Sequence, residues 1–321
     1  GTHANSDRML LSARLVLADG TLLDTGDAAS RRDFSRSHGE FLRAVEALRD
    51  RVRGDEALTR RILHKYSIKN VRGLNLLPLV RFDDPFEIIA HLMVGSEGTL
   101  AFLAGVTMRT EREYEHKASA MVYFSDIGEA SRAVVEMRKL QDAAGERIVH
   151  SAEMLDSKSL ASVGDATGEG LTAVLTETKA HTPEELAANV ARIGGLLERF
   201  ALYVPARFTD DPAEQAKYWA VRSGIFPAVG GSRPAGTTCL IEDVAFHIED
   251  LPRATAELQA LIARHGYDDA CIYGHALEGN YHFIINQSFS TPAEAARYEA
   301  LMNDVVELVV GRYDCSLKAE H

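Results

Sequence analysis

Two histidines in residues 271–286, CIYGHALEGNYHFIIN, have types and spacing that could bind a cation. His275 and His282 are seven positions apart, so on one straight strand their side chains would point to opposite faces. On a helix they would share a face, but the glycines and the β-branched and aromatic residues of this stretch disfavour a helix. The spacing therefore points to a bent element.

A β-hairpin with Glu278-Gly279 at its turn would bring the two imidazoles together. In that register residue 275 lies directly opposite residue 282, with Cβ atoms about 5 Å apart. We expect the pair to bind one cation, with the amide of Asn280 at the same turn. The alternative is two histidines on a half-exposed hairpin that bind only water.

A carboxylate that could complete this site stands at the end of the sequence, in Lys318-Ala319-Glu320-His321. Two histidines and one carboxylate are a typical catalytic metal shell that leaves a coordination position open. The sequence alone does not bring Glu320 to the hairpin, and a frayed, charged terminus is the competing interpretation.

Two other segments could contact a ligand. In the loop 94–100, VGSEGTL, two glycines let the backbone approach a ligand closely, although many such segments are only turns. Arg222 lies in the aromatic-rich helical stretch YWAVR and could bind a carboxylate with two hydrogen bonds. A surface ion pair is the alternative for this arginine.

The first third of the chain must position the loop 94–100. Residues 9–25 alternate apolar and polar around Asp19-Gly20, which predicts a hairpin. Residues 31–66 have helical apolar spacing, and residues 84–93 begin with the Asp-Pro of a helix start. A strand, AFLAGVTMRT, follows the loop, and a charged run at 111–117 suggests a domain boundary.

The rest of the chain alternates strands with long amphipathic helices, and several strands are separated only by short turns. This pattern predicts an α+β domain with a mostly antiparallel sheet and helices on one face. Strands are expected at 118–124, 148–155, 171–178, 237–247, 270–276, 281–287 and 313–319. Helices are expected at 127–143, 182–200, 213–226, 249–265 and 291–310.

Composition excludes some partners. The formal net charge of −12 argues against nucleic acid or an anionic membrane, because both need basic surfaces. The three cysteines are far apart in sequence and form no CxxC pair, which is typical of a reducing cytoplasm. No apolar run reaches about 18 residues. We expect no membrane span and a cytoplasmic protein, at most peripheral to the inner membrane.

Several motifs, in this order, resemble the FAD-linked oxidase family. VGSEGTLAF (94–102) is similar to a flavin-contacting segment of vanillyl-alcohol-oxidase (PCMH-type) FAD domains. SAEMLDS (151–157), YWAVRSGI (218–225), GHALEGNYH (274–282) and KAEH (318–321) are similar to motifs of the FAD-linked oxidase C-terminal domain. The opening stretch and KYSIKNVRGLNLLPLV (65–80) resemble the large bacterial branch, in which an iron–sulfur region follows the flavin part.

The resemblance implies a fold and a function. Residues 1–115 would be the C-terminal part of a PCMH-type FAD-binding domain. Residues 116–321 would be a ferredoxin-like α+β substrate and metal domain, with a large antiparallel sheet covered by helices. The enzyme would be an FAD-dependent dehydrogenase that oxidises a small D-2-hydroxy acid of the D-lactate, D-2-hydroxyglutarate and glycolate class. Hydride would pass to the flavin and a histidine would take the hydroxyl proton.

The resemblance also implies residue roles. The divalent metal, zinc, would be held by His275, His282 and Glu320. His321 would be the base, Arg222 would bind the substrate carboxylate, and Asn280 would line the same pocket. The cofactor-binding residues along FAD would be those of the loop: Gly95, Ser96, Glu97, Gly98 and Thr99. The electron acceptor, an iron–sulfur region or a quinone chain, would lie outside this sequence.

Departures from the family pattern temper these expectations. The acidic residue of the hairpin is usually an Asp after Gly, whereas this sequence has Leu277-Glu278. No lysine occurs in residues 240–244, where relatives that act on D-lactate or D-2-hydroxyglutarate often carry one. The glycine-rich loop for the FAD pyrophosphate would precede Gly1. We therefore expect a fragment that binds FAD weakly or not at all and is itself inactive.

Two other functional classes are compatible with the same residues. The first is a metal-dependent enzyme without flavin, such as a zinc hydrolase or an iron(II) oxygenase, built on the two histidines and Glu320. The second is a non-catalytic binding or scaffold domain.

Overall fold

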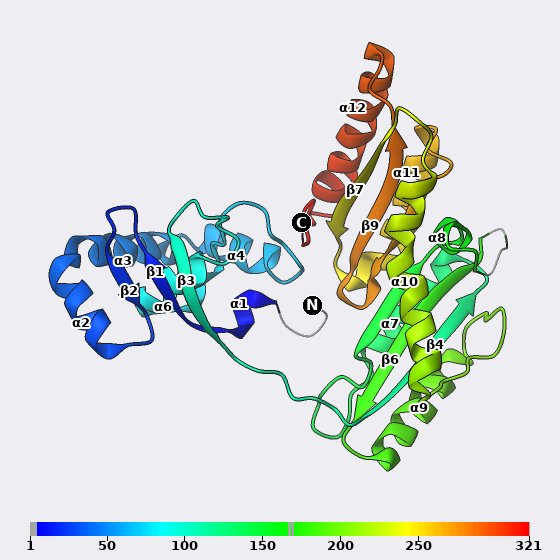
Figure 1. The fold of residues 1–321 in the computed structure, drawn as a ribbon, viewed down its shortest axis with the longest axis horizontal. Helices are drawn as coiled ribbons and strands as arrows, with labels where there is room; N and C mark the ends of the chain where they lie inside the picture. The colour runs from blue at the N-terminus through cyan, green and yellow to red at the C-terminus, as the bar shows by residue number, and fades with distance from the viewer. Residues whose placement is uncertain (1–4, 166–167, 169, 321) are drawn as a thin grey trace. The chain divides into compact units, whose positions relative to one another are not determined.

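The computed structural model describes residues 5–165, 168 and 170–320 (Figure 1). The chain divides into two compact units, one built from residues up to Arg112 and the other from residues 113–319. Each unit is described by itself below. The assignment of residues 1–115 to an FAD-binding domain and of 116–321 to a substrate domain stays a prediction.

The first unit contains a small antiparallel sheet in the order β2-β1-β3. Its strands are β1 (Leu10–Val16), β2 (Leu22–Asp24) and β3 (Phe102–Met108). The first two form the predicted hairpin, in which Val16 pairs with Leu22 across a turn that contains Gly20 in a left-handed conformation. Strand β3 lies at the edge of the sheet, and most of its side chains are exposed.

Six helices complete the described part of this unit: α1 (Ser6–Met9), α2 (Ala28–Ser37), α3 (Gly39–Gly54), α4 (Glu56–Lys65), α5 (Leu77–Arg81) and α6 (Pro85–Leu92). Asp84 caps α6 by accepting a hydrogen bond from the Phe86 amide, which explains why the predicted helix starts there. Leu15, Leu23 and Phe34 are buried together with residues of α6 and hold the helices against the sheet.

The second unit is built on a six-stranded sheet in which every pairing is antiparallel. Its order is β4-β6-β5-β8-β9-β7. The strands are β4 (His116–Phe124), β5 (Ser151–Leu155), β6 (Thr172–Ala180), β7 (Thr238–Ala245), β8 (Cys271–His275) and β9 (Asn280–Gln287). The predicted α+β class with a large antiparallel sheet is thus confirmed.

Two halves of this sheet have the same connectivity. The chain runs strand, helix, two strands and helix through β4, α7, β5, β6 and α9, and again through β7, α11, β8, β9 and α12. In each half the third strand lies between the first and the second, and the halves join where β5 pairs with β8. The two strands at the centre of the sheet therefore occupy equivalent places in the two halves.

The helices of this unit are α7 (Ile127–Arg138), α8 (Ser157–Ser162), α9 (Pro183–Leu197), α10 (Pro212–Ser232), α11 (Leu251–Arg264) and α12 (Pro292–Val306). Three of them start with a polar N-cap followed by proline, at Thr182, Asp211 and Thr291. A proline at the first helical position removes an amide that would have no helical partner, so these dipeptides fix the helix starts.

Helices cover both faces of this sheet, whereas the sequence predicted one. Ile225 and Val229 of α10 pack against Leu175, Cys271 and Tyr273 on one face. Met137 of α7 lies near Thr176, whose side chain points to the opposite face. Figure 1 shows α10 running across the front of the sheet and α7 behind it. The face under α10 carries the residues considered below.

The predicted strand at 313–319 is wrong. A π-helix (Glu307–Arg312) extends α12, and the following segment makes one isolated bridge, between Ser316 and Ala245. Asp314 adopts a positive φ of 53°, which breaks any extended run. No helix in the described part of the chain combines the length and apolar character needed to cross a bilayer.

Candidate active site

Strand register places four ionisable side chains on one face of the second unit's sheet. Glu153 of β5 pairs with His275 of β8, and Asp243 of β7 pairs with His282 of β9. His282 pairs in turn with Tyr273, which lies two residues before His275 on the same strand. Directly paired residues and residues two apart share a face, so all four side chains point to the α10 side.

The two imidazoles face each other, but the predicted register of the hairpin is wrong by two residues. Tyr273, not His275, lies directly opposite His282. The cause is a short 3₁₀ turn (Ala276–Glu278), which lengthens the connection beyond a two-residue turn at Glu278-Gly279. A shift of two residues keeps the face, and the imidazole centroids lie 5.6 Å apart with their planes at 83°.

Two glycines of this hairpin have no room for a side chain. Gly279 has φ +68°, and a Cβ there would lie 2.1 Å from the carbonyl oxygen of Phe246. Its own carbonyl accepts a hydrogen bond from the Phe246 amide at 2.8 Å. At Gly274, with φ +150°, a Cβ would lie 2.7 Å from the carbonyl oxygen of Asn280. Close backbone packing therefore fixes the hairpin that carries both histidines.

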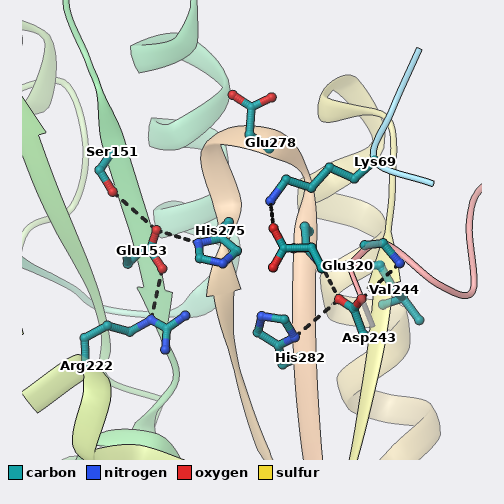
Figure 2. Close-up of polar contacts among 12 residues, drawn as sticks. Lys69, Ser151, Glu153, Arg222, Asp243, Val244, His275, Glu278, His282 and Glu320 are labelled. Carbon is teal, nitrogen blue, oxygen red and sulfur yellow. Dashed lines mark hydrogen bonds and ion pairs between the residues drawn. The ribbon is translucent and has the colours of Figure 1, made fainter. Parts of the chain in front are cut away.

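Glu153 is a buried carboxylate, 2% exposed, with a different partner on each oxygen. Its Oε1 accepts from His275 Nδ1 at 2.8 Å, and its Oε2 accepts from Arg222 Nε at 2.9 Å (Figure 2). Burial raises the pKa of Glu153, but the hydrogen bonds and charges of His275 and Arg222 outweigh it and lower the pKa to about 2. Glu153 is therefore an anion at neutral pH.

Arg222 lies on α10, where the sequence predicted a helix. Besides its hydrogen bond to Glu153, its guanidinium lies over the Tyr273 ring, 4.8 Å from the ring centroid. The side chain is 17% exposed. A guanidinium can bind a carboxylate through two parallel N–H groups, and only Nε is committed to Glu153 by these contacts. Arg222 does form an ion pair, as the alternative expected, but its partner is the buried Glu153 and not a surface carboxylate.

Asp243 is completely buried and organises the other half of the site. Its Oδ1 accepts from Asn280 Nδ2 at 2.6 Å and lies 3.3 Å from His282 Nδ1. Its Oδ2 accepts from the backbone amide of Ala319 at 3.0 Å. Asp243 thus connects β9 to the segment that ends the chain. The amide of Asn280 points at Asp243 and at the carbonyl of Val244.

The donor set suits a divalent metal. Glu320 follows Ala319 directly, and one ligand atom each from His275, His282 and Glu320 lies within 4.8 Å of the others. Two imidazole nitrogens and a carboxylate oxygen are ligands that zinc and other divalent transition metals accept. His321, the expected base, lies outside the described residues.

The loop 94–100 of the first unit has the conformation that its glycines suggested. Gly95, Glu97 and Gly98 all have positive φ, of 79°, 52° and 76°. A Cβ added at either glycine would meet nothing within 4 Å, so the backbone is open to a ligand there. The hydroxyls of Ser96 and Thr99 donate instead to the carbonyls of Met93 and Ser96.

A shallow hollow of about 340 Å³ adjoins this loop, lined by Met93, Ser96, Glu97, Gly98, Ala101, Phe102 and Leu103. FAD is far larger than this hollow. The exposed backbone and apolar lining fit contact with one part of an extended cofactor. These residues can therefore contribute to binding FAD but do not enclose it.

Sequence reasoning missed the two buried carboxylates as site residues. Glu153 stands at the centre of the apolar strand SAEML, and Asp243 in CLIEDVA. A buried carboxylate is costly unless it is paired, so an acidic residue in the middle of an apolar strand was the available signal. Glu278, which departs from the family pattern, forms ion pairs with Arg138 and Arg147.

Comparison with known proteins identifies the family. Residues 113–321 match the family described as FAD linked oxidases, C-terminal domain. The glycolate oxidase subunit GlcD of Escherichia coli K12 is 27% identical over 244 residues, which cover 74% of this chain and 46% of that protein. The D-2-hydroxyglutarate dehydrogenase of Xanthomonas citri pv. viticola is 25% identical over 72% of this chain and 48% of its own length.

A third relative, the mitochondrial D-lactate dehydrogenase [cytochrome] of Arabidopsis thaliana, is 25% identical over 66% of this chain and 36% of its own. The chain thus spans about half, or less, of the length of these curated relatives.

Solved structures with a similar fold cover nearly the whole chain. An alkyldihydroxyacetonephosphate synthase superimposes with a TM-score of 0.58 at 13% identity, over 98% of this chain and 50% of that one. A 4-ethylphenol oxidase from Gulosibacter chungangensis gives a TM-score of 0.58 at 12% identity, over 100% and 59% of the two chains. At these identities the likeness shows the fold. Since the family match covers most of the chain, this protein belongs to the FAD linked oxidases that share this C-terminal domain.

Proposed function

We propose that this chain is the substrate-binding part of an FAD-dependent dehydrogenase that oxidises a small D-2-hydroxy acid to the 2-oxo acid. One observation carries the proposal. Two imidazoles face each other on the sheet, each with a buried carboxylate at its Nδ1, and an arginine shares one of these carboxylates. The named activities of the relatives, on glycolate, D-lactate and D-2-hydroxyglutarate, support the substrate class.

The carboxylates support a metal site at the other ring nitrogens. A carboxylate at Nδ1 holds the proton on that nitrogen and leaves Nε2 with its lone pair, which is the form that binds a metal. His275 has Glu153 in this position at 2.8 Å, and His282 has Asp243 at 3.3 Å. We propose that His275 and His282 bind zinc together with Glu320.

Arg222 is the proposed partner of the substrate carboxylate. It reaches the same face as the two histidines from α10, and Tyr273 supports its guanidinium from below. A 2-hydroxy acid has its hydroxyl one carbon away from its carboxylate. Binding the carboxylate at Arg222 would therefore fix the position of the hydroxyl relative to the histidines. Asn280, held by Asp243, is proposed to line the same pocket.

The two cofactors would supply what side chains cannot. When bound, FAD supplies a two-electron acceptor for the hydride, and a divalent cation supplies a Lewis acid for the hydroxyl group. The chain itself binds the carboxylate and orients the imidazoles. His321 is proposed, from the family resemblance alone, to accept the hydroxyl proton. Gly95, Ser96, Glu97, Gly98 and Thr99 are proposed to line part of FAD.

Because the chain covers only part of its relatives, the complete activity is a property we propose for the full-length protein. The electron acceptor is proposed to lie outside this sequence, as an iron–sulfur region or a quinone chain. We also propose a cytoplasmic location, at most peripheral to the inner membrane.

The 2-His-1-carboxylate arrangement also favours a second candidate, a metal-dependent enzyme without flavin. The absorption spectrum of the full-length protein separates the two candidates. A flavin band at about 450 nm supports the dehydrogenase, because flavin is its redox group. A colourless protein with a stoichiometric metal would support the alternative.

The direct test is a screen of the full-length protein with an artificial electron acceptor and both enantiomers of several 2-hydroxy acids. We expect turnover of one or more D-acids and little of the L-acids. Equal turnover of both enantiomers, or of neither, would refute the proposal. His282→Ala should abolish turnover while the fold is retained. His265→Ala serves as the matched control, at a histidine that directly follows α11 and pairs with Asp304 of α12.

A further inference from the structure

One carboxylate, that of Glu153, connects the proposed metal site to the proposed substrate site. Its two oxygens accept separate hydrogen bonds, one from His275 Nδ1 at 2.8 Å and one from Arg222 Nε at 2.9 Å. The two partners come from different elements, β8 and α10. Figure 2 shows the carboxylate standing between the imidazole and the guanidinium.

The position of this carboxylate is itself fixed. Glu153 lies on β5 at the centre of the sheet, directly paired with His275 through the strand register. The hydroxyl of Ser151, two residues earlier on the same face, donates to Oε1 at 3.3 Å. The side chain is 2% exposed, so water does not compete freely for its oxygens. Both partners are therefore oriented by one rigid group.

Arg222 depends on Glu153 for its orientation. The arginine side chain is long and flexible, and on this face of the sheet its Nε donates a hydrogen bond to Glu153. The Tyr273 ring limits the guanidinium on one side. The hydrogen bond to Glu153 uses Nε and leaves the edge formed by the two terminal nitrogens for another partner. That is the edge that binds a substrate carboxylate through two parallel hydrogen bonds.

The geometry points to Glu153 as a positioning residue that couples the metal-binding imidazole of His275 to the carboxylate-binding guanidinium of Arg222. This inference rests on the proposed function and deepens it. Glu153 does not bind metal or substrate itself, because both its oxygens are engaged by the two groups that do. Its loss should therefore affect both binding events together, although neither ligand touches it.

Glu153→Gln in the full-length protein tests the coupling. A glutamine has one acceptor oxygen and one donor NH₂ group, so it cannot accept from both partners. We expect zinc affinity, measured by competition with a chromophoric chelator, to fall about 10- to 100-fold. We also expect the KM for D-lactate to rise roughly tenfold or more. Arg222→Gln should raise the KM and leave zinc affinity within about twofold.

The double variant and a matched control separate positioning from a general structural role. In the Glu153→Gln background, Arg222→Gln should raise KM by much less than it does alone, because the arginine acts through the carboxylate. Glu177→Gln removes another buried carboxylate on the same face, one that pairs with Lys179. It should leave zinc affinity and KM unchanged. If Glu153→Gln lowers only the thermal midpoint, with both constants unchanged, the inference is overturned.

Crystal structures of the metal-free full-length protein and its Glu153→Gln variant give a readout that needs neither zinc nor turnover. We expect the variant to show His275 or Arg222, or both, rotated away from the wild-type position. Unchanged positions of both side chains would overturn the inference. A wild-type protein that binds no zinc, combined with rotated side chains in the variant, would refute the proposed function and leave the positioning role standing.

Discussion

The two carboxylate–imidazole pairs of the site look alike in the sheet but differ in what surrounds them. Asp243 and His282 are almost completely buried, and the carboxylate also binds an amide side chain and a backbone N–H. In the other pair His275 is 23% exposed, and Glu153 also binds the cationic Arg222. Each pair places a carboxylate oxygen at an imidazole Nδ1, at 2.8 Å for His275 and 3.3 Å for His282, but the two pairs differ in charge and exposure.

This difference separates two tasks within one site. Asp243 of β7 connects β9 and the segment around Ala319 through hydrogen-bond donors that carry no charge. This half therefore contributes mainly to the shape of the site. In the other half, the Glu153 carboxylate is bound by Arg222, the proposed partner of the substrate carboxylate. This half therefore contributes mainly to electrostatics and ligand orientation. Substitutions of Asp243 and of the backbone around it should mainly change stability, and substitutions of Glu153 should mainly change binding and pH dependence.

Gly279→Ala should give the largest effect, because it acts on the backbone of the Asp243 half. The added Cβ would lie 2.1 Å from the Phe246 carbonyl oxygen, and the residue has φ +68°. We expect the free energy of unfolding to fall by more than about 3 kcal/mol in urea titrations. Gly266→Ala is the matched control, with φ +76° and no atom within 4 Å, and should cost about 1 kcal/mol. Equal costs for the two variants would contradict this account of the hairpin.

Asp243→Asn should come next. The Asn280 amide and the Ala319 N–H donate to different oxygens of Asp243, and an asparagine offers one acceptor oxygen, so at least one buried donor loses its partner. We expect the free energy of unfolding to fall by about 2–3 kcal/mol. Glu242→Gln, at the adjacent residue bound to Tyr298 and Lys318, should change it by less than about 1 kcal/mol. If the two variants are equally stable, Asp243 is not the organiser of its half.

Glu153→Gln should change how stability depends on pH. The pKa of Glu153 in the folded protein is lowered from 4.5 to about 2, so its stabilising effect is present above pH 4.5 and is lost as pH falls toward 2. The wild-type protein should therefore lose stability over this window, and the variant should lose less. Urea titrations at several pH values measure the difference, and parallel curves for the two proteins would argue against an ionised Glu153.

Asp156, three residues after Glu153, has a raised pKa instead of a lowered one. Burial raises its pKa from 3.8 to about 6, because it outweighs the hydrogen bonds from Ser159 and the Ile272 amide and the charge of Lys158. Its protonated form favours folding below pH 3.8, and this contribution is lost as pH rises through about 6. Asp156→Asn should remove that loss, visible as a flatter stability curve between pH 4 and 6.

Glu278→Gln should have the smallest effect. Its ion pairs with Arg138 and Arg147 lie at the rim of the site, where both arginines are about one-third exposed. We expect a loss of stability of less than about 1 kcal/mol, and no change in zinc affinity beyond about twofold. A larger drop in zinc affinity would show that this turn, and not only the two buried pairs, holds the histidines in place.

Local patterns in the sequence were sufficient to predict most of the elements and the face shared by the histidines. Helical apolar spacing and the Asp84-Pro85 pair predicted helices, and the alternation around Asp19-Gly20 predicted the first hairpin. The hairpin register was missed because Leu277 and Glu278 carry no signature of a 3₁₀ turn. The prediction that the two histidines share a face was still correct, because the register differs by two residues and side chains alternate between faces with a period of two.

The carboxylate partners could not be predicted in the same way. Glu153 and His275 are separated by 122 residues and meet only because β5 pairs with β8. No local pattern specifies which central strands become neighbours. The strand predicted at 313–319 failed for a related reason. Its residues alternate like a strand, but the described chain there has one bridging partner, through Ser316.

The central claim is that His275, His282 and Glu320 bind one divalent metal, with the imidazoles held by the two buried carboxylates. X-ray absorption spectroscopy of the zinc-loaded full-length protein tests it most directly. The account predicts one zinc per chain, with two imidazole nitrogens and oxygen ligands at about 2.0–2.2 Å. His275→Ala and His282→Ala should each remove one imidazole from that shell. A zinc shell that keeps both imidazoles in either variant, or no zinc bound by the wild-type protein, would contradict it.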